Sequence, residues 1–213
     1  MSLICNCPVG ASITDIPLNA CPEAVGQIQK VILQRIYSTG ATRNSITNPL
    51  VKASWTPLLA AADGTKVVQS PYISAPTTEA GAAKVYGGGD NTTLGGVEIV
   101  LGRNPTTFTG SILHSTQDTI KALKSYECEA VGVWLVNENG KIICLVDNRE
   151  TPTKYYPIPV KSFFVGDKTL GGLDSVDMNA ISWKFLPNWS DDLVILTPTD
   201  FNALTDLITP EGS

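Results

Sequence analysis

Histidine, the residue that most often performs acid–base chemistry in enzymes, occurs once in this chain, as His114. It stands beside Ser111 and Ser115, directly before a segment that we predict to be helical. A serine nucleophile needs a base within hydrogen-bond reach, and the Gly-x-Ser-x-Gly elbow that often presents such a serine does not precede this histidine. We therefore expect His114 to lie at the helix start or on the surface, and we predict that the protein is not an enzyme.

The thiols are the next candidates for chemistry, and the chain has five: Cys5, Cys7, Cys21, Cys128 and Cys144. A structural zinc site needs four ligands, usually supplied in Cys-x(2–4)-Cys pairs. Cys5 and Cys7 are separated by one residue, only Cys21 lies near them, and the histidine is far along the chain. We expect no metal and no other cofactor, and we expect the thiols to be buried as small apolar side chains.

Two further groups of residues could in principle form sites. Asp174 with Asp177, and Asp191 with Asp192, could supply the carboxylates of a glycosidase, but no spacing sets two of them opposite each other. The run Gly87–Gly89 lacks the following lysine and helix of a phosphate-binding loop. We predict solvated turns for the acids and a flexible loop or hairpin tip for the glycines.

The tryptophans could form a platform for a carbohydrate ring. Trp134 lies in a segment that is apolar on both faces, so we expect it in the core. Trp183 and Trp189 flank a Pro-Asn pair and could lie exposed together, whereas Trp55 follows a loop-rich stretch. We favour core or protein-interface positions over sugar binding, because tryptophan is enriched at interfaces.

Composition favours a protein that contacts other proteins. Charged residues make up 16% of the 213 residues, against about 25% in typical soluble domains. The net charge is −5 and no Lys/Arg cluster occurs, which excludes a protein that grips nucleic acid through its phosphates. From Asp167 onward there are eight acids and two bases. No signal peptide or apolar stretch of membrane-spanning length is found, so we expect cytoplasmic synthesis, reduced thiols and no membrane.

Strand patterns dominate the chain, and we expect one domain over 1–213. The clearest element is a hairpin with strands at 131–136 and 141–146, joined by a turn at 137–140 that ends in Asn-Gly. Both strands are apolar on both faces, so we predict that they lie in mid-sheet under two covering layers. Other strands are expected at 26–37, 65–68, 97–102, 155–165 and 178–185, of which 155–165 has the proline content of an edge strand.

Helix signals are fewer. Ser115 to Asp118 has the form of a capping box, and the apolar residues after it recur at helical spacing: Ile120, Leu123, Tyr126 and Ala130. We also predict a short helix capped by Thr199 that carries Phe201, Leu204, Leu207 and Ile208. Two segments lack a regular pattern: an extended arm over 1–25 and a Ser/Thr/Gly-rich loop over 69–96. A loop of this length inside a compact domain is generally functional.

This order of elements resembles the major tail (tail tube) proteins of tailed bacteriophages. The resemblance covers most of the chain and rests on layout: the arm, the long loop, the amphipathic helix, the central hairpin and the strand over 180–185. It implies a mainly β fold, with sheets that form a sandwich or barrel, one flanking α-helix, the long extended loop and the N-terminal arm. In that family six subunits form a ring around a channel, rings stack through the long loop and arms, and DNA passes through the lumen.

The resemblance implies a virion protein that assembles with itself and with other tail or connector proteins while DNA passes without binding. Its long loop would supply the contacts between subunits: Ser70, Tyr72, Gly87, Gly88, Gly89, Asn91 and Thr92. Acids of the carboxy-terminal quarter would face the lumen, where like charge prevents DNA from sticking: Asp174, Asp177, Asp191 and Asp192. Other functions stay open: a capsid decoration or head–tail connector protein, a carbohydrate-binding β-sandwich and, more distantly, a hydrolase.

Overall fold

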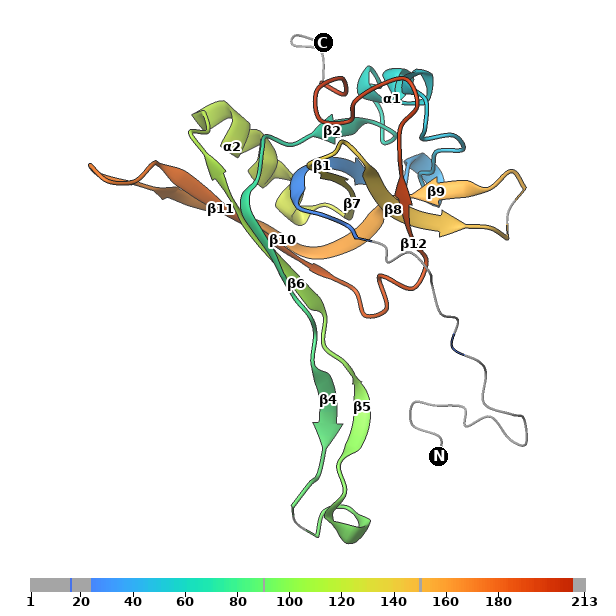
Figure 1. Cartoon of the computed structure of the whole chain (residues 1–213), viewed down its shortest axis with the longest axis vertical. Coiled ribbons are helices and arrows are strands. Elements are labelled where there is room, and N and C mark those ends of the chain that lie inside the picture. Colours follow the sequence, from blue (N-terminus) through green and yellow to red (C-terminus); the bar gives the residue numbers. More distant parts are fainter. Residues whose placement is uncertain (1–15, 17–23, 90, 150, 209–213) are drawn as a thin grey trace.

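Figure 1 shows a computed structural model of the chain, which describes the residues 16, 24–89, 91–149 and 151–208. Strands hold 42% of the described residues and helices 13%, so the predicted mainly β class is confirmed. Most of the predicted arm over 1–25 lies outside the described residues, and so do Cys5, Cys7 and Cys21.

Twelve strands and two α-helices are formed by the described part of the chain. The strands are β1 (Ile28–Arg35), β2 (Val67–Gln69), β3 (Ser74–Glu79), β4 (Ala83–Tyr86), β5 (Ile99–Arg103), β6 (Thr106–Leu113), β7 (Val131–Asn137), β8 (Ile142–Asp147), β9 (Lys154–Tyr156), β10 (Ile158–Thr169), β11 (Met178–Phe185) and β12 (Leu193–Leu196). The α-helices are α1 (Thr56–Leu59) and α2 (Gln117–Lys124), and the short 3-10 turns are η1 (Thr39–Ala41), η2 (Lys52–Ser54), η3 (Leu94–Gly96) and η4 (Ser125–Cys128). The strands predicted at 26–37, 65–68, 97–102 and 178–185 are confirmed, with ends within two residues of those observed.

Antiparallel pairing connects most of the strands in one path, in the order β12-β8-β7-β10-β11-β6-β3. β1 pairs with the other edge of β7, β2 with β1, and β9 with β8. The path folds over, so that side chains of β1, β7 and β8 share one core with side chains of β6, β10 and β11. This sandwich-like body leaves β4 and β5 as a separate two-stranded ribbon that projects away from it (Figure 1).

The central hairpin is confirmed, and β7 is buried along its whole length. β1 pairs with one edge of β7 from Ile28 to Arg35, while β8 and β10 share the other edge. Gly140, at the end of the turn, has a φ of 72°, which glycine adopts without strain. The central position of β7 explains why its sequence is apolar on both faces.

Aromatic rings fill the core of the sandwich. Phe108 stacks on Trp183 with ring centroids 4.0 Å apart, and Phe163 lies on the same indole at 6.0 Å. Phe185 meets Trp183 edge to face at 6.1 Å and stacks on Trp189 at 4.3 Å. Offset and edge-to-face pairs of this kind add about 0.5–1.5 kcal/mol each beyond the area that they bury. β6 and β11, which carry most of these rings, are therefore held firmly to each other.

The other face of β7 is covered by the outer layer, made of the segments 46–67 and 196–207. Ile32 of β1 and Trp134 of β7 point into it, and Trp55 meets Trp134 edge to face at a centroid distance of 5.2 Å. The predicted second covering layer is therefore present.

The segment predicted as one edge strand over 155–165 is divided between β9, which pairs only with β8 among the described strands, and β10, for which the edge prediction is wrong. β10 pairs first with β7, at Ile158 and Pro159, and then with β11 as far as Thr169. Pro157 lies just before β10 and Pro159 is its second residue, near the start of the strand, where a missing N–H is tolerated. A register shift near Ser162, whose φ is 53°, marks a bulge that redirects β10 from one sheet to the next.

The predicted main helix is confirmed as α2, and it buries Ile120 and Leu123 against the sandwich core. Its cap differs by one residue from the prediction. Thr116 accepts the hydrogen bond at the amino end, while the hydroxyl of Ser115 donates to Oδ1 of Asn179 (2.7 Å). Ser115 therefore links the helix start to β11 instead of capping the helix.

The short helix predicted after Thr199 does not form in the described residues. Oδ1 of Asn202 accepts from the backbone of Leu204 (2.9 Å), and Oδ2 of Asp206 accepts from the backbone of Asn202 (2.9 Å). Such side-chain bonds compete with helical ones and hold a turn. The segment nonetheless buries Leu204 and Leu207 in the outer layer.

The chain over 69–96 is not a continuous loop as predicted, because it contains the strands β3 and β4. β3 pairs with β6 along the edge of the body, and β4 pairs with β5 in the projecting ribbon. Its Ser/Thr content suggested a loop, yet threonine is well suited to strands with an exposed face.

Trp134→Phe should destabilise the protein more than Trp183→Phe. Both indoles are fully buried, but Nε1 of Trp134 donates to Oε1 of Gln34 (3.2 Å), whereas Nε1 of Trp183 has no partner among the described residues. Both variants lose similar packing, and only the first leaves a buried carbonyl without its donor, at an added cost of about 1–3 kcal/mol. Urea unfolding of the two variants measures the difference, and equal losses would contradict this account.

Candidate interaction surface

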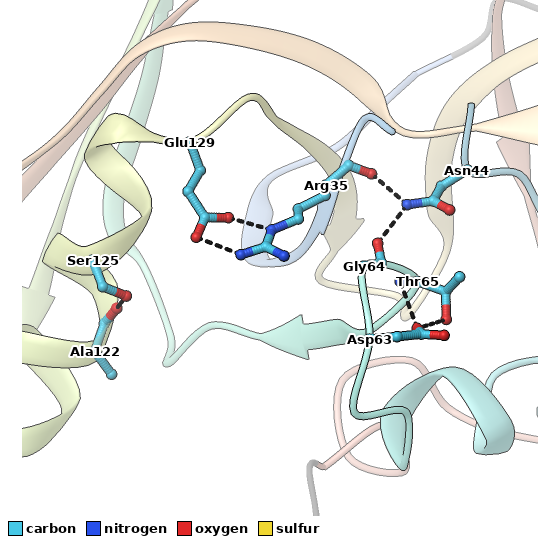
Figure 2. Close-up of polar contacts among 8 residues, drawn as sticks. All are labelled: Arg35, Asn44, Asp63, Gly64, Thr65, Ala122, Ser125 and Glu129. Atoms are coloured by element: carbon cyan, nitrogen blue, oxygen red, sulfur yellow. Dashed lines mark hydrogen bonds and ion pairs between the residues drawn. The ribbon is translucent and has the colours of Figure 1, made fainter. Parts of the chain in front are cut away.

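A hollow of about 320 Å³ lies between β1 and the loop that precedes β2. Figure 2 shows the hydrogen bonds that join the neighbouring chain segments. Nδ2 of Asn44 donates to the carbonyl oxygens of Arg35 (2.9 Å) and Gly64 (2.7 Å), and Oδ1 of Asp63 accepts from the backbone of Thr65 (2.8 Å). The contacts of Asn44 fix the loop against β1.

An ion pair stands beside this hollow. The guanidinium of Arg35 makes two parallel hydrogen bonds to Glu129, Nε to Oε2 at 2.6 Å and Nη2 to Oε1 at 2.7 Å (Figure 2). It ties the end of β1 to the residues that precede β7. The hydrogen bond from Arg35 lowers the pKa of Glu129, and burial raises the pKa of the nearby Tyr126 hydroxyl. The ion pair therefore adds a side-chain contact at the end of the β1–β7 pair.

The residues that could do chemistry lie apart. His114 is exposed before α2, as predicted, and its backbone N–H donates to the backbone carbonyl of Asp177 (3.1 Å). Cys144 is buried, as predicted, and burial raises the pKa of its thiol. Cys128 is exposed, which corrects the prediction of burial for that thiol. Within the described ranges no three His, Cys, Asp or Glu side chains gather to hold a metal ion, and no helix there is long and apolar enough to cross a bilayer.

The four acids proposed for a lumen do not form one patch. Asp174 and Asp177 lie in the turn before β11, and Asp191 and Asp192 follow its other end. The eight residues of β11 separate the pairs by about 25 Å. Asp177 is also structural, because its Oδ1 accepts from the backbone of Gly171 (3.0 Å), whereas the other three acids are exposed.

The four tryptophans do not form an exposed platform. Trp55, Trp134 and Trp183 are fully buried, and Trp189 is half-buried against Phe185. The expectation that Trp134 lies in the core is confirmed, and the exposed Trp183–Trp189 pair that a sugar would need does not exist.

The most distinctive surface is the ribbon of β4 and β5. From here on we call this ribbon the arm (residues 83–103), which is distinct from the extended segment predicted over 1–25. It extends from the lower end of the body in Figure 1, and its two strands pair only with each other. Six of its apolar side chains are exposed by 40–66%: Val85, Tyr86, Val97, Ile99, Val100 and Leu101. A two-stranded ribbon is marginally stable alone in water, and exposed apolar strands are typical of interaction sites.

Both faces of the arm are apolar. Val85 lies opposite Val100, and Tyr86 lies opposite Ile99. Opposite residues in an antiparallel pair share a face, and successive residues alternate between faces. One face therefore presents two valines and the other presents Tyr86 with Ile99, so a partner can bury apolar surface on either side.

Glycines shape the tip of the arm, as the hairpin-tip prediction requires. Gly87 and Gly88 have φ values of 75° and 111°. A Cβ on Gly87 would meet Cγ2 of Thr93 at 2.4 Å, and one on Gly88 would meet Cγ of Glu98 at 2.6 Å. The backbone can take this course after β4 because these two positions lack side chains.

The residues proposed as an assembly interface fall into two places. Those at the arm tip are Gly87, Gly88, Gly89, Asn91 and Thr92, of which Gly89, Asn91 and Thr92 are exposed. Tyr72 is exposed on the body, before β3. Ser70 is buried, and its Oγ accepts from the backbone of Val31 (3.0 Å), so its proposed place in an interface is wrong. The apolar residues of β5 were missed as interface candidates, although the sequence contains them as a continuous apolar run.

Glu129→Gln should lower the free energy of unfolding at neutral pH by roughly 0.5–1 kcal/mol, the range of a partly exposed ion pair. Because the folded-state pKa of Glu129 is lowered, its contribution is present above the unfolded-state pKa and is lost as the pH falls through the folded-state value. The difference from wild type should therefore shrink in urea unfolding at acidic pH. Glu79→Gln, at an exposed position, serves as the control, and a difference that is constant down to pH 3 would exclude this role.

Gly88→Ala should open the tip of the arm without affecting the body. The added methyl group meets Glu98 and a φ of 111° is unfavourable for alanine, so protease cleavage within residues 83–103 should accelerate. Gly102→Ala is the matched control, since no atom lies within 4 Å of its added Cβ. Limited proteolysis with mass spectrometry measures the effect, and equal cleavage rates in the two variants would contradict it.

Comparison with known proteins does not assign a family to this chain. Neither a protein-family model nor a curated protein sequence matches it. The function has to be inferred from the arm and from the fold that carries it.

Proposed function

We propose that this chain is a virion structural protein that assembles with copies of itself into stacked rings, of the kind that form the tail tube of a tailed bacteriophage. Six copies would form one ring, and DNA would pass through the lumen without being bound. Other tail or connector proteins would contact the ends of the stack.

The observation that carries the proposal is the uncovered arm. Six exposed apolar side chains on a ribbon with two apolar faces are costly to keep in water, at about 25 cal/mol per Å² of apolar surface. Within the described residues the ribbon has no third strand and no covering layer. A second protein surface that covers it would stabilise both the contact and the ribbon itself.

The body supports the same proposal. A mainly β, sandwich-like fold with α2 on its flank is the fold that the resemblance to tail tube proteins implies. Side chains of the described residues fill its two hydrophobic clusters, and no group of those residues could hold a metal ion. The side chains that could do chemistry are scattered. These features favour a scaffold over an enzyme.

Acids at both ends of β11 suit a channel that DNA must traverse. Asp174, Asp191 and Asp192 are exposed, and repeated copies would place negative charge at more than one height of a stack. Like charge removes the attraction that counterion release gives to a basic surface.

Replacing residues 83–103 by a two-residue Asn-Gly turn tests the role of the arm. The backbone N–H of Asn104 donates to the carbonyl of Ala82 (3.0 Å), so the ribbon can close at that point. The shortened protein should keep the unfolding midpoint of the body. Negative-stain electron microscopy and mass photometry should find rings or tubes for wild type and no tubes for the shortened protein.

Point variants supply a matched control. Val97 on the arm and Ile208 on the body are both 66% exposed. Val97→Ser should weaken tube formation, and Ile208→Ser should not. Tubes formed equally by the shortened protein would refute the role of the arm, while trimers or monomers of wild type would favour a decoration protein or a carbohydrate-binding module.

A further inference from the structure

The body has a second exposed apolar surface, at the end opposite to the arm. β6 leaves the arm at Thr106, and its last residue, Leu113, lies opposite Met178 at the start of β11. The start of β3 lies at this same end, because Ser74 pairs with Ser111. The far end of the sheet is therefore built by the start of β3, the end of β6 and the turn between β10 and β11, which reaches out at the upper left of Figure 1.

Exposed apolar side chains concentrate at this far end: Tyr72, Leu113, Leu170, Leu173 and Val176. Leu173 is fully exposed. Beside Tyr72 and Leu113 the surface is hollowed, with a volume of about 510 Å³, and the hollow is lined further by Gln27, Gln29 and the start of β3. We call the hollow and these five side chains the far-end surface. It combines a concave, partly apolar floor with a projecting apolar turn.

One cation lies beside the hollow's Tyr72. Nζ of Lys30 lies 4.3 Å from the centre of the Tyr72 ring and donates to the carbonyl of Leu204 (2.8 Å) and to Oε1 of Gln69 (3.5 Å). No carboxylate of the described residues forms an ion pair with this lysine. Both ends carry charges of either sign, since the arm exposes Lys84 and Glu98 and the far-end turn exposes Asp174. An arm inserted into the hollow can therefore pair Glu98 with Lys30, without a net charge difference between the two surfaces.

We propose that the far-end surface of one copy receives the arm of the next copy. This inference rests on the proposed self-assembly and identifies its acceptor. A chain cannot fill its own hollow with its own arm, because β6 holds the two at opposite ends. A contact between unlike ends of identical subunits can repeat without closing, which is the kind of contact that a stack requires.

Three equally exposed tyrosines test the proposal. Tyr86 on the arm is 53% exposed, Tyr72 at the far end 54%, and Tyr37 at neither site 52%. Tyr86→Ser and Tyr72→Ser should each weaken self-association about tenfold or more, as expected when an aromatic side chain is lost from a buried contact. Tyr37→Ser should have no effect. Mass photometry across protein concentrations measures the association, and circular dichroism confirms that each variant is folded.

Mixing variants identifies which ends meet. The shortened protein keeps the far-end surface, and a Tyr72→Ser/Leu113→Ser protein keeps the arm. Neither should stack alone, and together they should form one arm-to-hollow contact without further growth. Stacking by the Tyr72→Ser/Leu113→Ser protein alone would show that the arm docks elsewhere, which overturns this inference and leaves the proposed function standing. Wild type that does not self-associate would overturn both.

Discussion

Burial of β7 on both faces is the constraint on which the rest of the structure depends. A buried strand can leave neither its N–H nor its C=O groups without partners. β1 satisfies one edge of β7, and β8 and β10 divide the other. Its faces need two layers, and the aromatic core around Trp183 supplies one while the layer around Trp55 supplies the other. The bend in β10 follows from this arrangement, because one strand has to pair with β7 and then continue into the opposing sheet.

The arm and β7 are similar in composition, but other elements cover β7 and none of those described covers the arm. Both are rich in apolar, β-branched residues, yet β5 has one partner strand where β7 has three. The body completes its two layers without using the arm. The same kind of sequence is therefore buried in β7 and exposed in β5. A ribbon of two strands is marginally stable alone, so β4 and β5 have to be stabilised by contact with another protein surface.

β6 places the two exposed apolar surfaces at opposite ends of the molecule. It runs from the arm to the far-end surface, and the ring stack of Phe108, Trp183 and Phe163 anchors its middle to β11 and β10. The two apolar surfaces are thus held apart by a rigid sheet. Subunits with unlike ends joined in this way add in one direction, whereas a self-complementary patch would close a dimer. The same geometry separates the acidic turns at the ends of β11.

Local patterns in the sequence determined the hairpin around Gly140, the buried face of α2 and the alternation in β11, because turn residues and side-chain periodicity act over a few neighbours. Only the tertiary structure decided that β10 is central, that Ser70 is buried and that residues 74–79 and 83–86 form strands. The partners of a strand come from distant parts of the chain, and its own residues do not record which strand lies beside it. The arm shows the same limit: its apolar run is visible in the sequence, but its exposure depends on what the fold leaves uncovered.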